Sequence, residues 1–171
     1  MQLEKLAIRP ATSRDLKLLQ DIANAMHSAK DIGYFEKSLH LQSEGSRLIL
    51  IAEYDGAPAG YTMLAWQPKY AFFKAMGFPE IQDLNVLPAL RRKGIARAII
   101  AHCEALARKK KLTHMGIGVG MDASYGAAQR LYVKLGYIPD GYGITYDRKT
   151  VTFGELKPID DHLSLMMVKE L

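Results

Sequence analysis

The sequence predicts a mixed α/β (α+β) fold in a single domain over residues 1–171, and three observations support this. A length of 171 residues fits one domain of ordinary size. Hydrophobic residues make up 49% and charged residues 24%, as in globular proteins. Strand and helix patterns alternate in the order β-α-α-β-β-β-α-β-α-β-β. Because the two kinds of segment are interleaved, we expect a sheet with helices on both faces.

The chain should begin with a strand and two helices. Residues 3–9 have the pattern of a strand. Thr12 is followed three residues later by Asp15, the spacing of a capping box, so a helix should cover residues 12–28. Residues 31–42 repeat apolar side chains near helical spacing, which predicts a second helix.

A hairpin comes next. Residues 47–54 form an almost continuous apolar run rich in β-forming residues, which predicts a buried strand. Asp55-Gly56 is a favoured pair for a tight turn, so a second strand should return as far as Trp66. Residues 67–78 are aromatic but interrupted by proline and glycine, and we expect a loop or a short helix there.

The second half of the chain alternates strands and helices. The expected strands are residues 80–87, 113–120, 137–138 and 162–168, and the expected helices are residues 94–110 and 125–135. Residues 139–161 are rich in Gly and Tyr and should form a loop. Gly116, Gly118 and Gly120 alternate along one expected strand, so all three share a face. We expect that face to be bare and open to the approach of a ligand. The alternative is a tightly packed helix that fills the same groove.

Composition and charge exclude several classes of protein. The longest clean apolar run, residues 48–52, is too short to cross a bilayer, and residues 1–10 lack the apolar core of a signal peptide. The single cysteine, Cys103, excludes an internal disulfide and fits a reducing compartment. The five histidines have no metal-ligand spacing, so no metal is expected. We therefore expect a cytoplasmic protein, whose net charge of +5 permits an anionic ligand.

One basic loop has the features of an anion site. Arg91, Arg92 and Lys93 precede Gly94, where a helix begins, and Ala96 keeps the first turn small. The first N–H groups of a helix have no partner within it, and the helix dipole adds positive potential there. The loop therefore predicts a site for a phosphate or a diphosphate. The alternative is a solvated basic turn.

These residues resemble the GNAT superfamily of N-acetyltransferases. Val86-Leu87-Pro88 matches the turn that ends a strand in this family, and residues 91–96 match its Arg-x-x-Gly-x-Ala motif. The later block Leu131–Tyr137 and the start at Ile8–Thr12 are also typical. The resemblance implies a mostly antiparallel sheet of six to seven strands, in which the fourth and fifth strands splay apart. It also implies that the cosubstrate acetyl-CoA binds in the cleft between these two strands.

The resemblance also assigns the donor site. The diphosphate would lie on the amides of residues 92–96, and the pantetheine would pair like an added strand with the backbone around Leu84 and Val86. The full set expected to bind the cofactor is Leu84, Val86, Arg91, Arg92, Lys93, Gly94, Ile95, Ala96 and Lys134.

An amine that attacks a thioester needs an acid for the departing thiolate, a base and a donor for the oxyanion. The resemblance makes Tyr132 the acid, although Tyr132 also lies on the apolar stripe of its helix and could serve packing alone. Asp83 and Asn85 point to the same side of their strand. Asp83 could take the amine proton directly or through water, or could be merely a polar strand end. A backbone N–H near Asn85 or Val86 would bind the oxyanion. The residues expected to contact the acceptor are Tyr34, Phe35, Trp66, Asn85 and Tyr142.

The resulting prediction is transfer of an acetyl group from acetyl-CoA to a primary amine of a small molecule or protein, by direct attack in a ternary complex. The alternative is a non-catalytic module that senses acyl-CoA or docks a partner. A nucleic-acid binder is disfavoured because no interleaved aromatic residues or reading motif occur. No nucleic-acid or membrane partner is expected. The resemblance also raises a homodimer, since similar proteins are often dimers.

Overall fold

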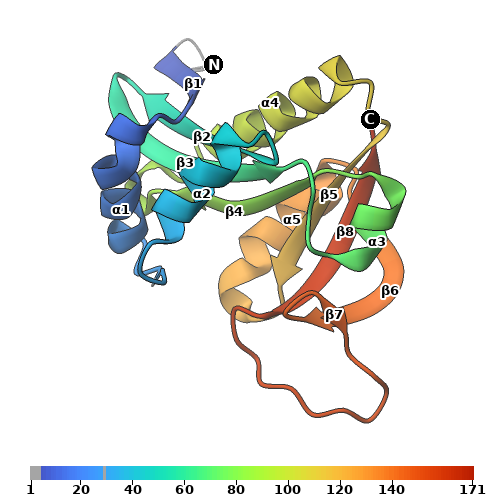
Figure 1. Ribbon diagram of the computed structural model, residues 1–171. Helices are drawn as coiled ribbons and strands as arrows, with labels where there is room; N and C mark the ends of the chain where they lie inside the picture. The colour runs from blue at the N-terminus through green and yellow to red at the C-terminus, as the bar shows by residue number, and fades with distance from the viewer. Residues whose placement is uncertain (1–4, 29) are drawn as a thin grey trace. The chain divides into compact units, whose positions relative to one another are not determined.

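The computed structural model describes residues 5–28 and 30–171 (Figure 1), which form two compact units. The first unit combines the described residues up to Trp66 with Ile81–Ala105, and the second combines Gln67–Glu80 with Leu106–Leu171. Helices accompany mostly antiparallel strands in both units, so the predicted mixed α/β fold is confirmed. The described residues contain eight strands, against six to seven expected. One continuous domain over the whole chain stays a prediction.

The strands of the first unit follow the order β1-β2-β3-β4. β1 (Leu6–Pro10) pairs antiparallel with β2 (Arg47–Tyr54), and β2 pairs antiparallel with β3 (Ala57–Ala65). The turn between β2 and β3 is the predicted Asp55-Gly56, and both residues have positive φ angles, of 55° and 76°. β4 (Glu80–Val86) lies next to β3, and all of it except Glu80 belongs to this unit.

Helices cover both faces of these strands. α1 (Leu16–Ala25) and α2 (Tyr34–Ser43) pack on the face that carries Ile49 and Ile51 (Figure 1). The opposite face is also covered, because Leu50 on that side of β2 is only 1% exposed. The first part of α4 (Ile95–Lys109) contributes further buried apolar side chains to this unit: Ile95, Ile99, Ile100 and Cys103.

The two N-terminal helices are shorter than predicted. A 3-10 turn, Ser13–Asp15, precedes α1, and α1 ends at Ala25 because the chain turns into a left-handed conformation at His27, where φ is 51°. α2 begins after Gly33, which also has a left-handed conformation, with φ of 77°. The part of the first predicted strand at residues 3–4 lies outside the described residues.

The predicted capping interaction at Thr12 and Asp15 is present and extends to Arg9. The Asp15 carboxylate accepts hydrogen bonds from the Thr12 N–H (2.8 Å) and hydroxyl (2.9 Å). The Arg9 guanidinium donates to both carboxylate oxygens, at 2.8 and 3.0 Å, and this bidentate contact holds the pKa of Asp15 well below its usual range. Asp15 is therefore ionised in the folded chain at neutral pH.

Asp15→Asn is expected to lower the free energy of unfolding by about 1–2 kcal/mol at pH 7, because the buried acceptor loses its charge. A carboxyl whose pKa is lower in the folded state stabilises the fold above its unfolded pKa of about 3.9 and loses that contribution below it. The difference between wild type and variant should therefore shrink as the pH falls from about 5 toward 2. Urea unfolding across this pH range measures it, and a constant difference would contradict the assignment.

The second unit contains the remaining elements, with strand order β5-β8-β6-β7. Their bounds are α3 (Ala71–Met76), β5 (His114–Gly120), α5 (Gly126–Lys134), β6 (Ile138–Tyr146), β7 (Lys149–Thr150) and β8 (Leu163–Glu170). β5 and β6 each pair antiparallel with β8. The Gly116 N–H of β5 donates to the Pro79 carbonyl, so the chain entering β4 runs beside β5.

The prediction of a loop from residue 139 was wrong, because β6 continues to Tyr146 and β7 follows it. The register of β6 on β8 shifts between Pro139 and Ile144, and Gly141 and Gly143 have φ angles of 91° and 77°. These glycines form an irregularity within a strand that continues beyond it.

The glycine face of β5 is occupied, contrary to the sequence expectation. A side chain at Gly116 would overlap the ring of Phe73 from α3, and one at Gly120 would overlap the ring of Tyr125. At Gly118 the nearest atom would be Met166 Sδ, at 3.1 Å. The glycines therefore allow large side chains of the same unit to lie directly on the strand. They serve packing and leave no bare surface for a ligand.

Among the described residues, every helix is too short or too polar to traverse a lipid bilayer. No group of three or more His, Cys, Asp or Glu side chains able to hold a metal ion occurs in residues 5–28 and 30–171.

Candidate active site

The basic loop leads from β4 to the start of α4. The Leu87 N–H donates to the Ala59 carbonyl, which ties the end of β4 to β3. Arg92 and Gly94 then take left-handed conformations, with φ angles of 64° and 83°. The Ala98 N–H donates to the Gly94 carbonyl at 3.0 Å, which is the first hydrogen bond of α4. The N–H groups of residues 95–97 therefore precede the helical ladder and are directed out of its first turn.

The side chains of this loop differ in what they can offer an anion. Arg91, Arg92 and Lys93 are all exposed. The Arg91 Nε donates to the Val86 carbonyl at 3.3 Å, and the Lys93 ammonium lies 5.1 Å from the centre of the Tyr54 ring. Each contact uses only part of the side chain and leaves N–H donors available.

The other expected donor-site residues have different environments. The Ile95 side chain is buried in the core, so only its N–H could serve a ligand, whereas Ala96 is half-buried. Leu84 is half-buried and Val86 is buried. Lys134 is exposed on α5 and belongs to the second unit.

The end of β4 is fixed by a close approach to β3. A side chain at Gly60 would overlap the Asn85 carbonyl, and it would lie 3.1 Å from the Val86 Cα. Only glycine lets the two backbones come this close. The strand that carries Leu84 and Val86 is thus held directly against its neighbour.

The carboxylate of Asp83, on β4, accepts four hydrogen bonds. Its Oδ1 accepts from Lys30 Nζ (2.8 Å) and Asn85 Nδ2 (2.7 Å). Its Oδ2 accepts from the hydroxyls of Tyr61 (2.8 Å) and Tyr34 (3.1 Å). All five residues belong to the first unit. The backbone at Asp83 is left-handed, with φ of 50°, an unusual conformation within a strand.

The chemistry of this Asp83 cluster follows from its donors. Every partner donates, and the four hydrogen bonds use two acceptor positions on each carboxylate oxygen. Burial, together with the charge of Asp83, raises the pKa of the Tyr61 phenol far above its ordinary value. The cluster therefore places one carboxylate beside one lysine amine and two phenols.

Sequence reasoning missed two members of the cluster. Lys30 lies between two expected helices, where no pattern distinguishes it from a solvated lysine. Tyr61 lies in an apolar strand and is 0% exposed. A buried tyrosine hydroxyl needs a partner, and this was the only available signal. Of the residues expected to contact an acceptor, Tyr34 and Asn85 do lie beside Asp83.

The other three expected acceptor residues have different environments. Phe35 is 3% exposed and packs edge-on against Tyr34 and Tyr61, and it also lines the pocket between α1 and α2. Trp66 is half-buried at the end of the first unit's hairpin. Tyr142 belongs to the second unit, where its ring lies 4.7 Å from that of Phe72.

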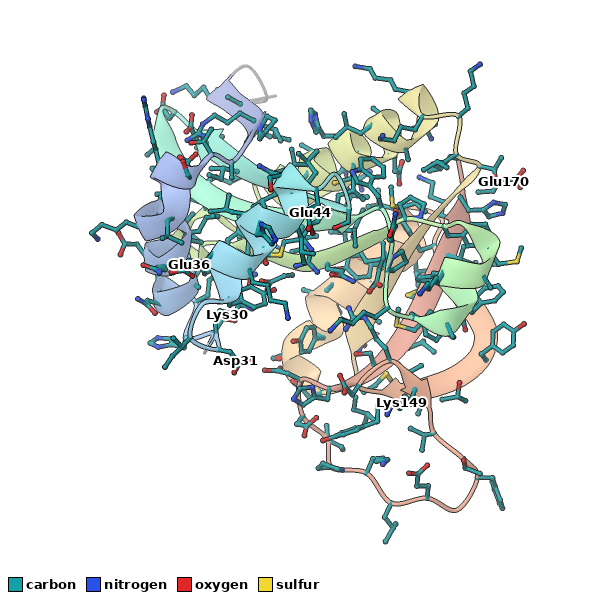
Figure 2. The ribbon with its side chains drawn as sticks, viewed as in Figure 1. Lys30, Asp31, Glu36, Glu44, Lys149 and Glu170 are labelled. Carbon is teal, nitrogen blue, oxygen red and sulfur yellow. The ribbon has the colours of Figure 1, made fainter. Side chains whose placement is uncertain are left out.

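A pocket of about 340 Å³ lies between the end of α1 and the start of α2. Figure 2 labels Lys30 and Asp31, on the segment that leads into α2, and Glu36 on α2 itself. These three residues line the pocket together with Asn24 and Tyr34. Because Lys30 and Tyr34 also contact Asp83, the pocket adjoins the cluster.

Tyr132 lies on α5 in the second unit and is 6% exposed. Burial, with a smaller contribution from Tyr125, raises the pKa of its phenol to about 12. The phenol therefore keeps its proton at neutral pH, as a proton donor must. Burial also raises the pKa of the Cys103 thiol to about 12, so this cysteine is no candidate nucleophile.

The model of the acetyltransferase (GNAT) family matches residues 16–137. No curated protein sequence matches significantly.

Several solved structures share the fold. Ribosomal-protein-alanine N-acetyltransferase from Brucella melitensis is 23% identical, with a TM-score of 0.69 over 96% of this chain and 99% of that one. YncA, a putative acetyltransferase from Salmonella typhimurium with its cofactor acetyl-CoA, is 19% identical, with a TM-score of 0.66 over 97% and 94%. Naa50 from Arabidopsis thaliana, in complex with the bisubstrate analogue CoA-Ac-MVNAL, is 13% identical, with a TM-score of 0.68 over 98% and 99%.

Proposed function

Since the chain belongs to the acetyltransferase (GNAT) family, we propose that it transfers an acetyl group from acetyl-CoA to a primary amine by direct attack in a ternary complex. The observation that carries the proposal is the start of α4, where unpaired helical N–H groups follow three exposed cations. Such a site suits a diphosphate. Acetyl-CoA-bound neighbours such as YncA support the choice of donor.

Acetyl-CoA would be held along the first unit. Its diphosphate would accept hydrogen bonds from the amides of residues 92–96. The side chains of Arg91, Arg92 and Lys93 would lie beside the 3′-phosphate of the cofactor. Its pantetheine would pair with the backbone at Leu84 and Val86, and the acetyl end would then lie near Asp83. Lys134 is proposed as a further cofactor contact from the second unit.

Three groups would carry the chemistry. The amine nitrogen attacks the thioester carbonyl, and a backbone N–H near Asn85 or Val86 binds the developing oxyanion. Asp83 takes the amine proton, directly or through water. The C–S bond then breaks, and Tyr132 donates its proton to the departing thiolate. Its raised pKa, about 12, ensures that this proton is present at neutral pH.

Asp83 would have to exchange a donor to act as a base. Its four hydrogen bonds occupy both carboxylate oxygens and leave no free position for a proton. An incoming alkylammonium has the same chemistry as the Lys30 ammonium. We therefore propose that the acceptor amine enters at the Lys30 position, beside Tyr34 and Asn85. We propose further acceptor contacts at Phe35, Trp66 and Tyr142. The pocket next to Lys30 would hold the rest of the acceptor.

Calorimetric titration tests the donor site. Acetyl-CoA is expected to bind, and its 3′-dephospho analogue is expected to bind roughly 10- to 100-fold more weakly, because each charge-assisted hydrogen bond contributes about 1.5–3 kcal/mol. Free CoA at matched concentrations is the control for the acetyl group. If none of the three ligands binds, the proposal is overturned.

Release of free thiol tests the reaction. Acetyl-CoA is incubated with the chain and a panel of small amines, polyamines and peptides, and acetylated products are identified by mass spectrometry. At least one amine should be acetylated faster than in a sample without protein. Donor binding without turnover on the panel would favour the acyl-CoA sensor.

A further inference from the structure

We propose that Lys30 is acetylated by the chain's own active site, which makes it a modification site on the acceptor side. This inference rests on the proposed function. It starts from the contact between the Lys30 ammonium and Asp83, at 2.8 Å. Lys30 is a primary alkylamine, and it already lies against the group proposed to take the acceptor's proton.

The surroundings of Lys30 differ from those of a surface lysine. Its side chain is 19% exposed, and its ammonium lies 5.1 Å from the centre of the Tyr34 ring. Lys17 on α1 also pairs with a carboxylate, Asp21, but its side chain is 84% exposed. Lys157 also contacts a carboxylate, that of Glu155, and an aromatic ring, that of Tyr146. Lys30 differs from it because its carboxylate partner is Asp83, the group proposed to take the acceptor's proton.

Lys30 can leave the carboxylate without disrupting the cluster. It lies outside α1 and α2, on the segment between them, so its movement breaks no helical hydrogen bond. Asp83 would keep the donors of Asn85, Tyr34 and Tyr61. The remaining three hydrogen bonds satisfy the carboxylate, and Lys30 is the partner that can be exchanged.

The reaction balances without any further reactant. The Lys30 ammonium gives one proton to Asp83, and the neutral nitrogen forms a C–N bond with the acetyl carbon. The second amine proton is lost to water as the tetrahedral intermediate collapses. The C–S bond breaks, and the thiolate takes the proton of Tyr132, which water then restores. Asp83 passes its proton to water, so the products are acetyl-Lys30, CoA and one proton released to solvent. The amide carries no charge, so Asp83 loses its cationic partner.

The experiment incubates the purified full chain with acetyl-CoA and no added amine, and measures the acetylated fraction of each lysine over time by peptide mass spectrometry. Lys30 should be acetylated at least about tenfold faster than the exposed Lys37 on α2, because it is held in place. The rate should not depend on protein concentration. Tyr132→Phe should slow acetylation of Lys30 and leave that of Lys37 unchanged.

The outcomes separate this inference from the proposed function. If added amines are acetylated while Lys30 stays unmodified, the inference is overturned and the function stands. If Lys30 and Lys37 react equally fast, or if the Lys30 rate rises with protein concentration, acetylation in place is likewise overturned. If acetyl-CoA does not bind in the titration above, both proposals fail. Lys30→Arg, which keeps the charge, identifies the modified peptide by its loss.

Discussion

Replacing Tyr132 by Phe is expected to lower turnover by roughly 10- to 1,000-fold and to leave the affinity for acetyl-CoA nearly unchanged, because the variant removes a general acid and keeps the ring. The ring is buried, so the apolar contacts of α5 persist in the variant. Steady-state thiol release gives kcat, and calorimetry gives the Kd for the donor.

Tyr146→Phe is the matched control. Tyr146 ends β6, and its hydroxyl donates to Asp160 at 2.8 Å, so turnover should be preserved. Full activity in Tyr132→Phe would remove this phenol from the mechanism. A fall in donor affinity as large as the fall in turnover would assign it a binding role instead.

Gly60→Ala is expected to reduce the free energy of unfolding by about 3 kcal/mol, at the upper end of the range for overpacking. The added methyl group would overlap the Asn85 carbonyl, which is backbone and cannot rotate away as a side chain can. β4 would have to move from β3, and the Leu87 N–H would lose its short contact with Ala59. Urea unfolding measures the change, and donor affinity should fall with it.

Gly126→Ala provides the control for the same chemical change. A side chain at this position has open space, and the residue lies in a helix without a positive φ angle. Alanine should stabilise the helix there by up to about 1 kcal/mol. Equal effects of the two substitutions would show that the close approach of β3 and β4 does not constrain the strand.

Local signals predicted the hairpin and the basic loop. Asp55-Gly56 determines its own turn, and residues 91–96 combine charge, glycine and a helix start within six positions. β6 was missed for the opposite reason. Its glycines indicate a loop when taken alone, and only pairing with the distant β8 makes the segment a strand.

The Asp83 cluster could be predicted only in part. Asp83 and Asn85 are two residues apart, so the period of a strand places them together. Lys30 and Tyr34 reach Asp83 across 53 and 49 positions of the sequence. No periodicity relates residues so far apart, and their meeting depends on how α2 packs on the strands. The glycines of β5 were expected to be bare because the side chains that cover them, Phe73, Tyr125 and Met166, come from other elements.

The first turn of α4 has a consequence for how the loop can be dissected. A diphosphate bound there would be gripped by main-chain amides, which every residue type except proline supplies. Alanine substitutions at residues 92–95 would then measure the contribution of the charged side chains, but they would not detect the hydrogen bonds from the main-chain amides. Semisynthetic chains in which a single peptide bond is replaced by an ester lack one N–H donor each. The loss of diphosphate affinity in each such chain would measure the contribution of that amide.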